Sequence, residues 1–258
     1  MRRWAGWILL GLALFVGLSL TFAPAQLVAL LIGRGPVQML APTGSFWSGG
    51  GKLVLIDQKL GDLELGDLVW QFKPGALLRG HLAFAVLLNR SAAQASATQI
   101  TATIELGPRS LVVSNLNGVI ANALLARAAS HYDVELQGDL KLTQLNLQTS
   151  RDRITAAQGE LFWAGGHVNY VLNGQNFAAN LGALHGRVGR FVEKRAPDRL
   201  VLDVDSVASH AKALRFTLSE AGWGSAAVTR QFMASAGFPW QGNAAPEEFV
   251  LEVQEKLF

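Results

Sequence analysis

The chain has 258 residues, of which 50% are apolar and 16% are charged, and its formal net charge is +3 at pH 7. This composition excludes a disordered chain, because there is too much apolar content and too little charge to keep it unfolded. Cysteine is absent, which excludes disulfide bonds and thiol chemistry, and no basic cluster outside the N-terminus points to nucleic-acid binding.

The first segment is an uncharged apolar run from Trp4 to Phe22, preceded by Arg2 and Arg3. A helix of about 20 such residues spans a bilayer core, and the two arginines favour a cytoplasmic N-terminus. Residues 1–24 are therefore predicted to be a single-pass membrane anchor, with residues 25–258 outside the cytoplasm. Cleavage at Ala23-Pro24-Ala25, which has the form of a signal-peptide site, is the alternative.

The segments after the anchor alternate apolar and polar residues with a period of two, as strands do. Gly-rich or polar turns separate them, which favours a mainly β fold with antiparallel strands. Three short helices interrupt this pattern. One follows the anchor and stops at Gly33 or Gly35 before Pro36, and the others are predicted at Gly118–His131 and Ala226–Gly237.

A motif of the form Phe-Trp-x-Gly-Gly occurs twice, and each copy is followed by an alternating strand. The repetition predicts two similar halves, residues 36–117 and 132–258, joined by a helix at 118–131. Paired glycines suit a turn or bulge, and the aromatic pair suits packing on the sheet. The predicted structural residues are Gly44, Phe46, Trp47, Gly49 and Gly50 in the first copy, and Phe162, Trp163, Gly165 and Gly166 in the second.

Catalytic and cofactor signatures are missing from the sequence. Gly51-Lys52 resembles part of a phosphate loop, but Phe46 stands where that loop needs its first glycine and Leu53 replaces the hydroxyl residue. Asp203 and Asp205 alternate with apolar residues, so we expect them on the solvated face of a strand. The histidines are isolated. We predict no enzyme activity, no catalytic residue, no cofactor and no metal.

Three segments together resemble a known family: "PTGSFWSG" near the anchor, "LVWQFKPGALLRGHLAF", and "VTRQFMASAGFPWQG" near the end. They resemble protein N of the bacterial type II secretion system. The resemblance implies an accessory component of the inner-membrane platform of a Gram-negative cell, which supports transport of folded proteins from the periplasm across the outer membrane. The segment around Trp70 and Pro74 is also similar to AsmA-like proteins, which implies a long curved β-sheet.

Two functions from different classes follow. In the first, the anchor tethers a periplasmic β domain that docks on other platform proteins through edge strands and apolar patches. The candidate contacts are Trp47, Trp70, Trp163, Trp223 and Trp240, of which Trp70, Trp223 and Trp240 are predicted as partner contacts. Since large aromatics in strands are usually buried, we expect most of the five to lie in the core. In the second, the apolar face of the sheet forms a groove that binds or transfers lipid.

Overall fold

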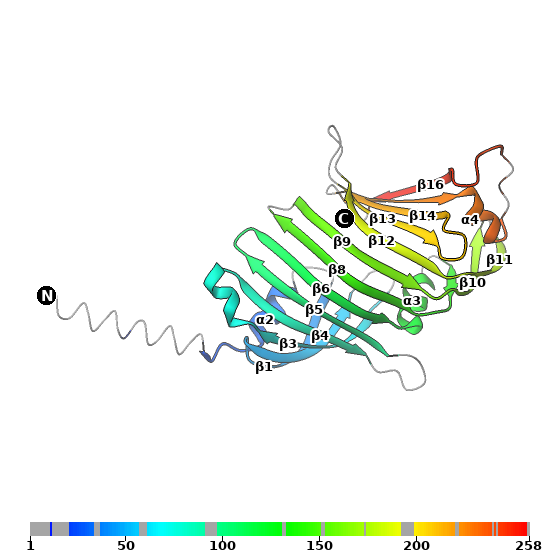
Figure 1. The fold of residues 1–258 in the computed structure, drawn as a ribbon. Coiled ribbons are helices and arrows are strands. Elements are labelled where there is room, and N and C mark those ends of the chain that lie inside the picture. Colours follow the sequence, from blue (N-terminus) through cyan, green and yellow to red (C-terminus); the bar gives the residue numbers. More distant parts are fainter. Residues whose placement is uncertain are drawn as a thin grey trace. The chain divides into compact units, whose positions relative to one another are not determined.

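The computed structural model describes residues 11, 21–33, 37–56, 61–90, 97–130, 133–150, 153–172, 174–191, 199–219, 222–238, 240 and 242–256. The chain divides into two compact units, Met1–Phe72 and Lys73–Phe258, and Figure 1 shows their elements in chain order. The helix predicted to join two halves lies inside the second unit, so the boundary between the units does not fall there.

The first unit holds one helix and three strands among its described residues: α2 (Gln26–Ile32), β1 (Val37–Gly44), β2 (Ser48–Leu55) and β3 (Leu63–Phe72). The helix ends at Gly33, as predicted. The strands are antiparallel in the order β1-β2-β3. Met39, Val54, Leu63, Leu68 and Trp70 are buried, which gives each of the three strands a share in the core.

The predicted anchor, residues 1–24, lies outside the described residues except for residues 11 and 21–24. Within the described part of the chain, no helix is both long and apolar enough to cross a membrane.

The second unit is built on an antiparallel sheet whose described strands follow the order β4-β5-β6-β8-β9-β12-β13-β14-β15-β16. A 3-10 helix, η1 (Pro74–Arg79), precedes it. The strands are β4 (Leu82–Arg90), β5 (Thr98–Gly107), β6 (Ser110–Ile120), β8 (Leu140–Ser150), β9 (Arg153–Trp163), β12 (Leu184–Phe191), β13 (Arg199–Ser206), β14 (Lys212–Ser219), β15 (Trp223–Thr229) and β16 (Phe249–Lys256). The predicted mainly β, antiparallel fold is confirmed.

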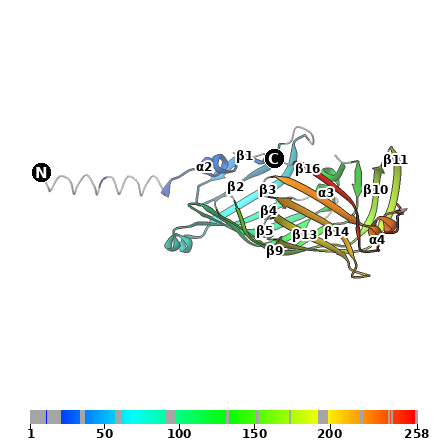
Figure 2. The ribbon, with the colours of Figure 1, turned by 90° about the horizontal axis from the view of Figure 1, so that it is seen from above.

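A second, three-stranded sheet has the order β11-β10-β7, with β7 (Val134–Leu136), β10 (Gly166–Leu172) and β11 (Gln175–Leu181). The remaining helices are α3 (Asn122–Ala129) and α4 (Arg230–Ser235). Figure 2 shows α3, β10 and β11 on one side of the larger sheet. On that side, α3 and the smaller sheet cover part of the larger sheet.

Both of these helices were predicted, but each begins later than expected. Gly118 pairs with Ile100 at the end of β6, and Ala226 pairs with Phe216 within β15. The residues before each helix thus extend a strand, and His131, the predicted last residue of the first helix, lies outside the described residues. These residues form part of a strand because pairing with the next strand satisfies the hydrogen bonds of their backbone N–H and C=O groups.

The two faces of the larger sheet differ in polarity because side chains alternate along each strand. Paired positions carry a row of apolar or glycine residues across seven strands, from β8 to β16. This row consists of Leu142, Leu161, Gly186, Val204, Leu214, Val228 and Leu251. The sheet is therefore amphipathic, with its apolar face toward α3 and the smaller sheet.

Candidate functional site

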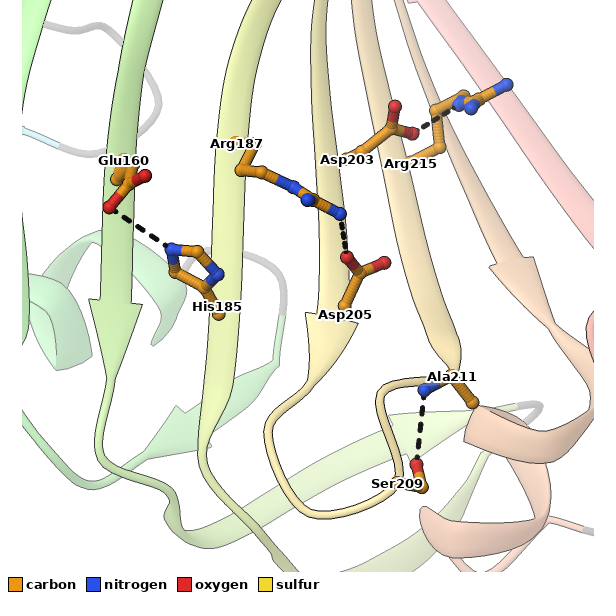
Figure 3. A network of polar contacts seen from close by, with 8 residues as sticks. All are labelled: Glu160, His185, Arg187, Asp203, Asp205, Ser209, Ala211 and Arg215. Carbon is orange, nitrogen blue, oxygen red and sulfur yellow. Dashed lines mark hydrogen bonds and ion pairs between the residues drawn. The ribbon is translucent and has the colours of Figure 1, made fainter.

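The polar face of the larger sheet carries ion pairs between neighbouring strands (Figure 3). Arg187 pairs with Asp205, and the Arg215 Nε lies 2.6 Å from Asp203 Oδ1. His185 Nε2 lies 3.5 Å from Glu160 Oε2. In the two arginine–aspartate pairs, opposite charges face each other across the strands, an arrangement that stabilises a sheet.

Asp203 and Asp205 therefore lie on the polar face, as predicted. Each carboxylate is engaged by a different arginine, so the two are not paired with each other. Among the residues that the structure describes, no three His, Cys, Asp or Glu side chains are grouped as metal ligands would be.

Lys52, the residue that resembles a phosphate-loop lysine, forms an ion pair in the first unit. Its Nζ lies 2.9 Å from Glu64 Oε1, and the hydrogen bond and charge of this carboxylate raise the pKa of Lys52. Gly51, just before it, sits in strand β2 opposite Leu68. An extended strand does not present a nest of backbone N–H groups to an anion.

The first Phe-Trp-x-Gly-Gly copy makes its turn earlier than predicted. Gly44 has φ +88°, and the chain turns through Ser45–Trp47 before β2 begins at Ser48. Gly49 and Gly50 lie inside β2, where they pair with Trp70 and Val69. Their role in this copy is therefore not to form the turn.

Gly49 instead makes room for the ring of Trp70. A Cβ at Gly49 would lie 2.6 Å from the Trp70 Cζ2 atom and 2.4 Å from the carbonyl oxygen of Thr43. The Trp70 Nε1–H donates to the carbonyl oxygen of Phe46 over 3.1 Å, and Trp47 packs edge-on against Phe72. Trp70 and the motif residue Trp47 thus hold the turn against the strands.

The second copy lies where the chain leaves the larger sheet for the smaller one. Phe162 and Trp163 end β9, and Gly166 begins β10. Gly165 and Gly166 have φ of +85° and +158°, so here the glycines do form the turn. The Trp163 Nε1–H donates to the carbonyl oxygen of Gln137 over 3.0 Å. The indole that bonds a backbone carbonyl is the motif's own Trp163 in this copy, but in the first copy it is Trp70, which lies outside the motif. The two copies also differ in connection geometry.

The three tryptophans predicted as partner contacts differ in exposure. Trp70 is 2% exposed, so its ring serves the core and is a wrong choice for a surface contact. Trp223 is 50% exposed and Trp240 is 37% exposed. Burial under Gly49 explains the difference for Trp70, because the missing side chain leaves space that a neighbouring ring fills.

The second unit contains an apolar cavity of about 310 Å³. Its floor is the apolar face of the larger sheet, and its cover comes from both helices and the smaller sheet. The floor residues include Leu161, Leu184, Leu202, Val204, Leu214 and Phe216. The cover residues are Leu125, Leu136, Val168, Leu181 and Phe232. Because these residues come from segments far apart in the sequence, no local motif could have revealed the cavity.

Tyr170 joins the cover of this cavity to the chain after α4. Its hydroxyl donates to the carbonyl oxygen of Ala236 over 2.8 Å, and its ring stacks on Phe177 with centroids 5.3 Å apart. Phe177 in turn meets Phe238 edge-on at 5.5 Å. The aromatic cluster of Tyr170, Phe177 and Phe238 thereby connects the smaller sheet with the end of α4.

Replacing Tyr170 with Phe should lower the free energy of unfolding by about 1 kcal/mol, since it removes one partly buried hydrogen bond. Burial raises the pKa of Tyr170, so the folded protein holds the phenol proton more tightly than the unfolded chain does. The stability contributed by Tyr170 is complete below the ordinary tyrosine pKa of about 10 and is lost as the pH rises through the higher folded pKa. Urea unfolding of the wild-type protein and the Tyr170→Phe variant, at neutral and at alkaline pH, measures the difference in their free energies of unfolding. A stability gap that widens above pH ~10 would contradict the assignment.

Comparison with known proteins bears on the whole chain. Residues 35–239 match the family model described as type II secretion system (T2SS), protein N. No curated protein and no solved structure matches the chain. The likeness to AsmA-like proteins stays a prediction. Because the family model covers well over half of the 258 residues, the chain belongs to the type II secretion system protein N family and is a component of that system.

Proposed function

We propose that the protein is an accessory structural component of the inner-membrane platform of the type II secretion system. In this role it supports the transport of folded proteins from the periplasm across the outer membrane. The observation that carries the proposal is the family match over residues 35–239. The apolar run at Trp4–Phe22 anchors the chain in the inner membrane with a cytoplasmic N-terminus, and the β-rich remainder lies in the periplasm, where it contacts other platform proteins.

The sheet of the second unit has features of a docking surface at one end. Strand β16 has the last place in the order of the described strands, and an edge strand offers unpaired backbone groups to a partner. Leu251 and Val253 on this strand are 38% and 58% exposed. Trp223 pairs with Lys256 at the end of the neighbouring strand and is half exposed. Exposed aromatic residues of this kind are frequent anchors of protein interfaces.

Deletion of the gene should leave folded exoproteins in the periplasm and reduce their amount in the medium. The measurement is the ratio of exoprotein activity in medium and periplasm, and an expressed copy of the wild-type chain should restore it. A tagged chain should co-purify platform proteins from solubilised membranes. Unchanged secretion together with no co-purifying platform protein would overturn the proposal.

The contact at Trp223 has a matched control within the same sheet. Phe191 lies at the end of β12, in the same sheet as Trp223. Its side chain is 55% exposed, close to the 50% of Trp223. Trp223→Ala should weaken co-purification of platform proteins several-fold, whereas Phe191→Ala should leave it unchanged. Equal recovery with both variants would remove Trp223 from the docking surface.

A further inference from the structure

The apolar cavity of the second unit offers almost no hydrogen bonds to an occupant. Its described lining residues are aliphatic or aromatic, apart from Gly186. The indole N–H of Trp163 is the polar side-chain group among them, and it already donates to the carbonyl oxygen of Gln137. The floor strands bond to one another through their backbones. An occupant would therefore meet hydrocarbon and ring surfaces.

This lining selects the chemistry of the occupant. A peptide segment carries an N–H and a C=O at nearly every residue, and burying these groups without hydrogen-bond partners is unfavourable. Burying a charged group is more unfavourable still. A hydrocarbon chain has no such groups and gains from leaving water. The volume of about 310 Å³ lies at the lower end of the range of roughly 300–1,000 Å³ found for small-molecule pockets.

The apolar floor continues beyond the cavity toward the edge of the sheet. Phe216 lines the cavity and is 41% exposed. It pairs with Ala226, which pairs with Val253 on β16, and this row crosses two strand spacings, roughly 10 Å. Phe216 and Val253 are exposed and Ala226 between them is half-buried, so this row gives a long, narrow occupant an apolar path out of the cavity.

We propose that this cavity binds the acyl chain of a fatty acid or a phospholipid. The inference goes beyond the proposed structural role in secretion and does not depend on it. One part of the acyl chain inserts among the floor and cover residues. The part that the cavity does not hold runs over Phe216 toward β16. The ion pairs of Arg187 and Arg215 lie on the opposite face of the sheet and take no part in holding the chain.

Photolabelling of the full-length protein in membrane vesicles tests this site. One arm uses palmitic acid that carries a diazirine in its chain, and the other uses phosphatidylethanolamine with the same modified chain. After illumination, peptide mass spectrometry should place adducts on β12–β14, α4 or β10 with at least one of the probes, and the probe that labels identifies the source of the chain. Adducts confined to residues 1–24, or no adducts with either probe, would overturn the proposal.

A matched pair of variants localises the binding. Phe216→Glu puts a charge at the mouth of the cavity at a position exposed enough to accept it, and it should reduce cavity adducts at least tenfold. Phe191→Glu places the same charge at a 55% exposed phenylalanine that borders Arg187 and Asp203 on the other face, and it should leave labelling unchanged. Equal labelling of both variants would contradict the assignment.

Chain length gives a second measurement on the unmodified protein, so the result does not depend on how well a variant folds. Unlabelled palmitic acid should compete with the probe much more strongly than decanoic acid does. Each methylene removed from the buried part of the chain should weaken competition about fourfold. Equal competition by the two acids would show that the chain is not buried and would overturn the proposal.

Discussion

Replacing Gly49 with Val should lower the melting temperature of the protein by roughly 6–12 °C, which corresponds to about 3 kcal/mol. A Cβ at this position would lie 2.4 Å from the carbonyl oxygen of Thr43 and 2.6 Å from the ring of Trp70. The carbonyl oxygen belongs to the backbone of β1 and the ring is buried, so neither can move without disturbing the strands. Displacing the ring also strains its hydrogen bond to Phe46. Thermal unfolding followed by circular dichroism measures the effect.

Gly189 provides the control for this substitution. It also lies in a strand, β12, but a Cβ there would meet no atom within 4 Å. Gly189→Val should therefore change the melting temperature little, because valine suits an extended strand. If Gly49→Val kept its melting temperature and instead lost binding of a phosphate ligand, the packing role would be wrong and the glycine-rich segment would be a ligand loop.

The strand pattern of this sequence could be predicted because side chains alternate with a period of two along so much of the chain. The positions of Asp203 and Asp205 follow from that period alone, and the structure places both on the polar face. Helix starts were harder to place, since Gly118–Ile120 and Ala226–Thr229 pair with neighbouring strands. Pairing with another strand leaves no trace in the residues that begin the helix pattern.

The exposed tryptophans and the apolar cavity were harder to predict from the sequence than the strands were. Trp70 and Trp223 were both predicted as partner contacts, yet one is 2% and the other 50% exposed. Strand order decides this difference, because Trp70 lies opposite Gly49 and Trp223 lies beside the last described strand. The apolar cavity depends in the same way on tertiary structure, since α3, α4 and two sheets supply its lining.

At the start of each helix that covers this cavity, side-chain oxygens accept hydrogen bonds from backbone N–H groups. The two helices obtain these oxygens from different residues. Ala121, at the start of α3, has no side chain that could cap the helix. Its backbone N–H donates to Thr98 Oγ1 over 2.9 Å, and the N–H of Asn122 donates to Asp139 Oδ1 over 2.7 Å. At α4 the capping residue itself, Thr229, accepts from the N–H of Phe232. Thr229 is therefore the residue through which the sheet positions α4.

Thr229→Val should destabilise the second unit by about 2–3 kcal/mol, because it removes a helix cap and leaves buried polar groups without a partner. Thr229 is 0% exposed, and its hydroxyl donates to the carbonyl oxygen of Lys212 over 2.8 Å. Valine has nearly the same shape, so lost hydrogen bonds rather than lost volume cause the effect. We expect the melting temperature to fall by roughly 4–12 °C.

The same substitution should also weaken acyl-chain labelling, since Phe232, whose N–H loses its acceptor in the variant, lines the cavity. Thr229→Ser keeps the hydroxyl and should retain most of both the stability and the labelling. If serine were as harmful as valine, the methyl group of Thr229 rather than its hydrogen bonds would hold α4 in place. If valine lowered the melting temperature but left labelling unchanged, α4 would not form a necessary wall of the cavity, and the chain would be held by the sheet and α3 alone.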